Sequence, residues 1–328
     1  MALRLEVEFE RRPAVYLPGE EVHGRLLVHV TVPEIRLRVL RVRVDGSAQT
    51  ELKEGAPGVT VLNSTEDGRH AARQRLLHAD IPLLPRRAHA LPQGVHPFPF
   101  AFAIAATTPG SLRLEHGSIR YGVQATAAPS ELLARAVTCW TEFEVRPRLL
   151  VAGRPALRQP GIVTGAVADR ELTNRGYTLR LARRGLSPGE LAVLELHASA
   201  ALLARLAAEP GLLQLVQVVQ YRPDGARLSE PSLLAREVVP GARFAGWEHV
   251  ELRVPADAPH TVPPESCAVL GRTFHIRVNT ALIQARIPLV IGTCPEDAQP
   301  PPPPPLPPPP EEPPPSYEEA MRQRAAEG

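Results

Sequence analysis

Four consecutive residues, Pro314-Pro315-Ser316-Tyr317, have the types and spacing of a peptide ligand. They follow a tract, residues 300–310, that is proline throughout except for Leu306. Proline fixes φ near −65° and donates no N–H, so such a tract stays in the extended polyproline II form. Binding that form costs little further order, and the aromatic grooves of WW and SH3 domains exploit this. The Pro-Pro-x-Tyr spacing predicts a WW-domain ligand in which Pro314, Pro315 and Tyr317 fill the groove and Ser316 faces outward.

The residues that follow the motif favour a short helix. Glu318 and Arg322 are four apart in the favourable order, and residues 318–326 are mostly good helix formers. A helix this short is marginal in water, so we expect it to form only on a partner surface. We expect residues 297–328, which include the motif, to form a disordered proline-rich tail. The alternative to a WW ligand is that this tail carries the tyrosine by chance.

Catalytic patterns are missing from the sequence. It contains no His-Glu-x-x-His, no Gly-x-Ser-x-Gly and no Gly-x-x-x-x-Gly-Lys segment. The eleven histidines are scattered, and Cys139, Cys267 and Cys294 form no Cys-x-x-Cys pair. We therefore expect no catalytic residues, no metal site, no cofactor and no small-molecule substrate, and we expect Cys139 to be an apolar strand residue.

The composition points to a cytoplasmic protein with a large core. Hydrophobic residues make up 44% of the 328 residues, and the net charge of +2 argues against nucleic-acid binding. An odd, sparse cysteine count favours a reducing compartment. The sequence shows no signal-like N-terminal segment and no apolar run of ~18 residues. Lys53 is the only lysine, so arginine carries almost all of the positive charge.

The first half of the sequence predicts a series of short strands. Leu5, Val7 and Phe9 alternate with glutamates, a pattern that buries one face of a strand. Similar runs occupy residues 22–30, 35–44, 98–104, 119–125 and 137–145. Pro99 should place its strand at a sheet edge, because proline cannot donate to a ladder. Residues 53–80 are polar and predict a long loop. This series of short alternating runs favours an all-β sandwich over residues 1–147.

An arginine-rich strand changes its alternation midway. Apolar residues hold odd positions from Ile35 to Val39 and even positions from Leu40 to Val44. A one-residue slip would turn the buried face outward, so we predict a β-bulge near Val39-Leu40. Four arginines then share the outward face: Arg36, Arg38, Arg41 and Arg43. That face is either a solvated surface that discourages sheet stacking or a basic surface for anionic lipid or an acidic cargo tail.

The second half repeats the first. The turn Leu17-Pro18-Gly19-Glu20 recurs as Ser187-Pro188-Gly189-Glu190, and an apolar strand follows each. Further strands are expected at residues 177–181, 213–221, 247–254, 274–278 and 287–293. Residues 198–208 have helical propensity, yet a sandwich favours a loop there. Near the end of each half, Ile276-Arg277-Val278 likewise echoes Ile119-Arg120-Tyr121. Two echoes in the same order indicate a second sandwich over residues 148–296, after a linker rich in proline and arginine.

Several of these segments together resemble the α-arrestins, the arrestin domain-containing proteins. The resemblance is carried by residues 15–20, 91–94, 98–100, 159–160 and 289–293, in the family's order and spacing. It implies two tandem arrestin-like, immunoglobulin-like β-sandwiches. It also implies an adaptor whose Pro-Pro-x-Tyr motif recruits WW-domain HECT-type ubiquitin ligases. The implied cargo is membrane receptors and transporters, which the adaptor would direct into ubiquitination, endocytosis and protein transport at the plasma membrane and endosomes.

One departure from the family pattern weakens that implication, and two other functions stay open. The chain has one Pro-Pro-x-Tyr motif where members of the family often have two, so we expect ligase recruitment to depend on oligomers or clustered cargo. The proline tract could instead bind SH3 domains or profilin, which would make the protein a signalling scaffold. A sandwich could also carry a small molecule or a lipid.

Overall fold

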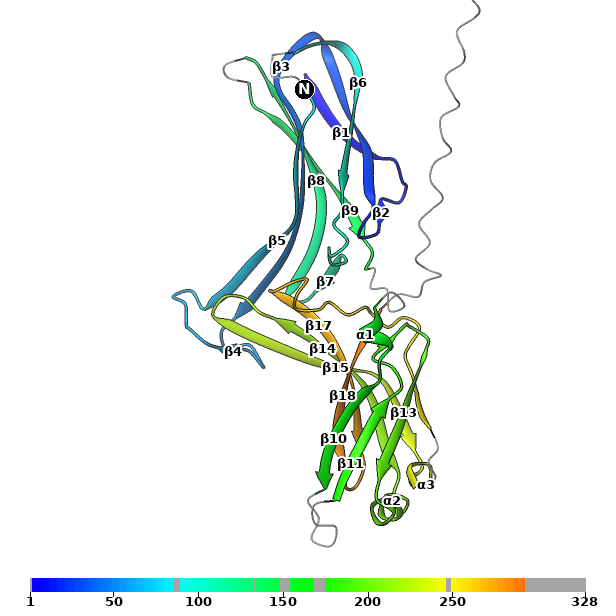
Figure 1. The fold of residues 1–328 in the computed structure, drawn as a ribbon. Coiled ribbons are helices and arrows are strands. Elements are labelled where there is room, and N and C mark those ends of the chain that lie inside the picture. Colours follow the sequence, from blue (N-terminus) through cyan, green and yellow to red (C-terminus); the bar gives the residue numbers. More distant parts are fainter. Residues whose placement is uncertain are drawn as a thin grey trace, which may run out of the picture. The chain divides into compact units, whose positions relative to one another are not determined.

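Alternating apolar and polar residues become strands through most of the described chain (Figure 1). The computed structural model describes residues 2–84, 89–131, 134–147, 154–167, 175–245 and 249–292. In β1 (Leu3–Phe9), for example, Leu3, Leu5 and Phe9 are buried. The remaining strands of the first half are β2 (Val15–Tyr16), β3 (Glu21–Lys53), β4 (Thr60–Val61), β5 (Arg69–Pro82), β6 (His89–Ala103), β7 (Leu112–Leu114), β8 (Gly117–Pro129) and β9 (Val137–Val145).

The second half adds nine strands and three short helices to the described structure. In chain order these are α1 (Pro155–Arg158), β10 (Gly161–Val167), β11 (Arg175–Leu181), β12 (Gly185–Leu186), β13 (Leu191–Ala198), α2 (Ala200–Leu206), β14 (Gly211–Tyr221), β15 (Ala226–Val239), α3 (Gly241–Ala245), β16 (Val250–Arg253), β17 (Leu270–Asn279) and β18 (Gln284–Ile291). The prediction of an all-β fold is confirmed.

The strands form three sheets. One has the order β1-β3-β8-β9-β2, with β5 and β6 also paired to β3 and β7 paired to β8. The second has the order β10-β11-β13-β16, and the third the order β12-β18-β17-β14-β15-β4. Strand β4 comes from the first half but pairs with β15, Val61 opposite Ala226. The division into domains at residues 147 and 148 stays a prediction, because buried residues of β14, β15 and β17 join the core of the first half.

The predicted bulge in β3 is confirmed, one residue earlier than expected. Against β8, Leu37 lies opposite Pro129 and Val39 opposite Ala128, which leaves Arg38 as the extra residue. Ile35 and Leu37 are buried on one side of the bulge, and Leu40, Val42 and Val44 on the other. The extra residue thus absorbs the change of phase and keeps one apolar face inward.

The repeated turn has the same structure in both halves. Gly19 and Gly189 have φ of +90° and +84°, values at which a side chain would be strained. The Glu20 carboxylate accepts the Leu17 N–H at 2.8 Å, and the Glu190 carboxylate accepts the Ser187 N–H at 2.8 Å. Each turn follows a two-residue strand, β2 or β12, that pairs in parallel with the last strand of its half, β9 or β18. The predicted repeat is confirmed at this turn.

Two local predictions are wrong. Residues 53–80 are not one loop, because β5 runs antiparallel to β3 from residue 69. Most of its side chains are exposed or half-buried, so the apolar alternation that marks a buried strand is missing. Residues 198–208 are also not a loop: α2 buries Leu202, Leu203 and Leu206. Leu202 and Leu206 are four apart on one helix face, and the second core covers that face.

Candidate functional site

The predicted WW ligand, Pro314-Pro315-Ser316-Tyr317, lies outside the described residues, as does Cys294. Pro99 lies in β6, which pairs only with β3 among the described strands, so its predicted edge position is confirmed. Cys139 lies in β9 and is half-buried. Burial raises the pKa of the Cys139 and Cys267 thiols, which keeps both protonated and poorly nucleophilic.

The four arginines predicted as a basic surface lie on the outward face of β3, on both sides of the bulge. Arg36 lies 3.4 Å from the Glu34 carboxylate. Arg41 and Arg43 lie 3.4 and 3.7 Å from the carboxylate of Asp80 on β5. Arg38 is exposed at the bulge itself. Acidic neighbours therefore offset much of the positive charge that the sequence suggested for this face.

A second set of arginines has no ion-paired carboxylate among the described residues. Arg236, Arg277 and Arg286 lie in one line across β15, β14, β17 and β18, because Gln214 pairs with both Arg236 and Arg277, and Arg277 pairs with Arg286. We call these three residues the arginine row. At the ~4.8 Å spacing of neighbouring strands the row spans about 14 Å. Phe274, Ile276 and Val278 fill the core between the alternate positions of β17, so the row lies on the opposite face of the sheet.

No carboxylate of the described residues neutralises the positive charge of the arginine row. Within the described part of the chain, no ion pair joins a carboxylate to one of its three guanidinium groups. Like charges directly opposite each other destabilise a sheet, and Arg277 and Arg286 are such a pair. Burial, and then the charges of Arg286 and Arg277, lower the pKa of the neighbouring His275. The row thus creates a local positive potential that an external anion would relieve.

Buried polar atoms that lack a hydrogen-bond partner accompany this charge. Nε of Arg277 and Nε2 of His275 are buried atoms without a hydrogen-bond partner in the described structure. Arg277, Arg286, Asn279 and Gln284 line a small polar hollow of about 270 Å³. Guanidinium groups bind carboxylates and phosphates with paired, charge-assisted hydrogen bonds. The row is therefore a candidate binding surface for acidic groups.

Sequence reasoning missed the arginine row. Apolar and polar residues alternate in the sequence around Arg277 and Arg286, and this pattern alone predicts that both side chains point outward from their strands. Their alignment with Arg236 depends on strand register over residues 211–286, and a single sequence does not reveal that register.

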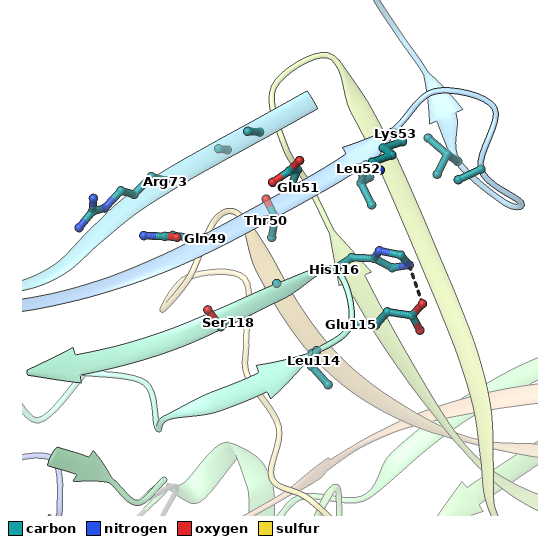
Figure 2. A pocket seen from close by; sticks show the side chains of 15 residues that line it. Gln49, Thr50, Glu51, Leu52, Lys53, Arg73, Leu114, Glu115, His116 and Ser118 are labelled. Atoms are coloured by element: carbon teal, nitrogen blue, oxygen red, sulfur yellow. Dashed lines mark ion pairs between the residues drawn. The ribbon is translucent and has the colours of Figure 1, made fainter. Parts of the chain in front are cut away.

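An open groove of about 950 Å³ lies beside the end of β3 (Figure 2). Residues 49–53, 71–73 and 114–118 contribute to its lining, and they come from β3, β5, β7, β8 and the turn between β7 and β8. Lys53, the only lysine of the sequence, is exposed in this groove. Glu51 and Arg73 also line it, so its charge is mixed.

Next to the groove, His70 of β5 contacts the turn between β14 and β15. The His70 side chain is fully buried, with Nδ1 3.0 Å from the backbone oxygen of Asp224 and Nε2 2.9 Å from the Glu54 carboxylate. The Gly225 backbone oxygen also accepts the N–H groups of Leu62 and Asn63. A side chain at Gly225 would approach Nδ1 of His70 to 3.0 Å, so glycine allows this close packing.

Both ring nitrogens of His70 face hydrogen-bond acceptors, the backbone oxygen of Asp224 and the Glu54 carboxylate. The Thr65 N–H, and then the His70 ring, lower the pKa of Glu54, which keeps that carboxylate ionised near neutral pH. The contact thus fastens the start of β5 to the turn between β14 and β15.

None of the helices in the described residues is long and apolar enough to cross a membrane.

The sheets, the repeated turn and the long bulged strand define an all-β protein. Residues 5–149 match the family model described as arrestin (or S-antigen), N-terminal domain. The chain is 26% identical to human (Homo sapiens) arrestin domain-containing protein 1, over 87% of this chain and 63% of that protein. The predicted resemblance to the arrestin domain-containing proteins, the α-arrestins, is thus confirmed.

Two further relatives are also arrestin domain-containing proteins. The chain is 24% identical to arrestin domain-containing protein 1 of Rattus norvegicus, over 90% of this chain and 65% of that protein. It is 21% identical to arrestin domain-containing protein 17 of Caenorhabditis elegans, over 90% of this chain and 72% of that protein. The chain therefore spans somewhat less than two thirds of the length of the human and rat relatives.

Proposed function

We propose that the protein is an α-arrestin-type adaptor. Its Pro314-Pro315-Ser316-Tyr317 segment binds WW domains of HECT-type ubiquitin ligases, and its β-sheets bind membrane receptors or transporters. Bringing the two together promotes ubiquitination, endocytosis and transport of the cargo. The adaptor acts in the cytoplasm and is recruited to the plasma membrane and endosomes. The observation that supports this most is the coexistence of an arrestin fold with a Pro-Pro-x-Tyr motif in one chain.

The arginine row is the surface we assign to cargo. Three uncompensated guanidinium groups on a rigid sheet suit an acidic cytoplasmic segment of a membrane protein. Preorganised charges raise the association rate and discriminate against basic partners more than they raise affinity. Such binding should weaken as salt increases, because a Debye length of about 8 Å screens exposed charges at physiological ionic strength. The β3 arginines contribute less, since Asp80 and Glu34 already offset them.

Reversing two charges of the row is expected to remove most cargo binding. The double variant Arg277→Glu/Arg286→Glu turns a repelling cationic pair into an anionic one, so acidic segments should be rejected. Affinity capture of membrane proteins from cell extract should fall at least tenfold. The matched control is Arg41→Glu/Arg43→Glu on β3, which should reduce capture by less than about threefold. The reverse ranking would assign cargo to the β3 surface and contradict the assignment to the row.

Proximity labelling in cells tests the adaptor function as a whole. The full chain is compared with a chain that lacks residues 313–328. We expect the full chain to label both HECT-type ligases and membrane proteins, and the shortened chain to label only the membrane proteins. Unchanged ligase labelling would exclude the motif as the ligase site. Labelling dominated by SH3-domain proteins or profilin in both chains would support a signalling scaffold instead.

A further inference from the structure

Three side chains that can bind a metal ion converge at the turn between β7 and β8, and two of them, Glu115 and His116, line the groove of Figure 2. Glu115, His116 and Glu230 each bring one ligand atom, and these atoms lie within 4.8 Å of one another. Nε2 of His116 is 3.7 Å from the Glu230 carboxylate and 4.0 Å from the Glu115 carboxylate. Figure 2 shows Glu115 and His116 pointing toward one another at the turn between β7 and β8.

The backbone holds this turn firmly against β3. The His116 oxygen accepts the Glu51 N–H at 3.0 Å. Gly117 follows, and a Cβ there would lie only 2.7 Å from the backbone oxygen of Gln49. Glycine thus lets the turn approach β3 closely and places His116 at a defined position. The cluster is therefore built on a short connection rather than on a long, mobile loop.

Tyr221 packs against one member of the cluster. Its ring meets the His116 imidazole edge to face, with centroids 5.4 Å apart and planes at 83°. Such outer partners fix the direction of metal ligands in many proteins.

An unsatisfied hydroxyl lies in the same groove. Thr50 lines the groove together with Glu115 and His116 and is only 3% exposed. Its Oγ1 has no hydrogen-bond partner among the described residues. A buried donor is normally satisfied, by water if not by protein. The groove thus combines an open approach, a hydroxyl that lacks a partner and a convergent ligand set.

We propose that Glu115, His116 and Glu230 bind Zn²⁺. One imidazole and two carboxylates suit zinc, which takes three protein ligands and one water in open sites, at distances of about 2.0–2.2 Å. Ca²⁺ and Mg²⁺ favour oxygen ligands throughout. The ligand atoms must move about 1 Å closer together, and the exposed side chain of Glu115 has the freedom to do so. The ion would join the turn between β7 and β8 to β15, independently of ligase and cargo.

Calorimetric titration of the full chain with Zn²⁺ tests this site. His116→Gln and Glu230→Gln each remove one ligand while keeping size and polarity. The control is His23→Gln, because His23 of β3 has a single carboxylate, Glu21, at 3.6 Å. Cysteines can also bind zinc, but they are the same in all four proteins. The second readout is hydrogen exchange of β15, whose amides should gain protection when zinc is added.

The expected result is one zinc ion bound to the wild type and to His23→Gln at micromolar zinc. Binding should be at least tenfold weaker in both cluster variants, and the protection of β15 should disappear with it. Equal affinity in all four proteins would overturn the proposal and assign zinc to the cysteines or to scattered histidines. So would zinc binding that leaves the exchange of β15 unchanged.

Discussion

Replacing Tyr317 by alanine is expected to reduce recovery of WW-domain ligases about ten- to a hundredfold. In the proposed complex the tyrosine ring fills its own pocket, and burying an aromatic side chain contributes about 1.5–3 kcal/mol. The four-residue motif buries little other surface, so we expect the wild-type affinity to be weaker than ~1 μM. Losing the ring from so small an interface removes a large share of the total binding free energy.

The measurement is a pull-down of ligases from cell extract with the full chain, followed by titration against an isolated WW domain. Ser316→Ala is the matched control, because Ser316 faces away from the groove and should leave recovery unchanged. Equal recovery by Tyr317→Ala and the wild type would end the ligase proposal. Loss in Ser316→Ala alone would show that the motif binds in a different register.

Local signals in the sequence predicted local structure well. The slip of phase between Ile35 and Leu40 predicted the bulge, since the period of two is set by neighbouring residues. The recurring Pro-Gly-Glu predicted two equivalent turns, because glycine with positive φ and a glutamate that accepts a nearby N–H are local requirements. The arrestin resemblance rested on several such segments in a fixed order, and the family comparison confirmed it.

Features that depend on distant pairing were not predicted. The arginine row exists because β14 brings together residues of β15 and β17, and that register is set by packing of the whole sheet. The sequence predicts a loop where β5 lies, because the partly exposed residues of this strand show no apolar period. The Glu115–His116–Glu230 cluster was missed for the same reason, since Glu230 lies more than a hundred positions beyond the other two. A scattered histidine in a sequence gives no sign of a carboxylate that folding places beside it.

Replacing Phe143 of β9 by alanine is expected to lower the free energy of unfolding by about 3–5 kcal/mol, the usual cost of emptying an aromatic core position. Phe143 is 5% exposed. Its ring lies within 6.0 Å, between centroids, of the rings of Phe9, Tyr16, Phe102 and Tyr121. These residues come from β1, β2, β6 and β8, so a cavity at Phe143 would loosen contacts between strands that are distant in sequence.

Chemical denaturation of the full chain measures the effect, and Thr138→Ala is the matched control. Thr138 lies on the same strand but is exposed, and surface substitutions usually change stability by less than about 0.5 kcal/mol. Because buried residues of β14, β15 and β17 share the first core, the cost at Phe143 should also reach the second half. We therefore expect hydrogen exchange in β14 to speed up together with exchange in β9. A cost below about 1 kcal/mol, or faster exchange confined to β9, would show that the aromatic cluster does not hold this core together.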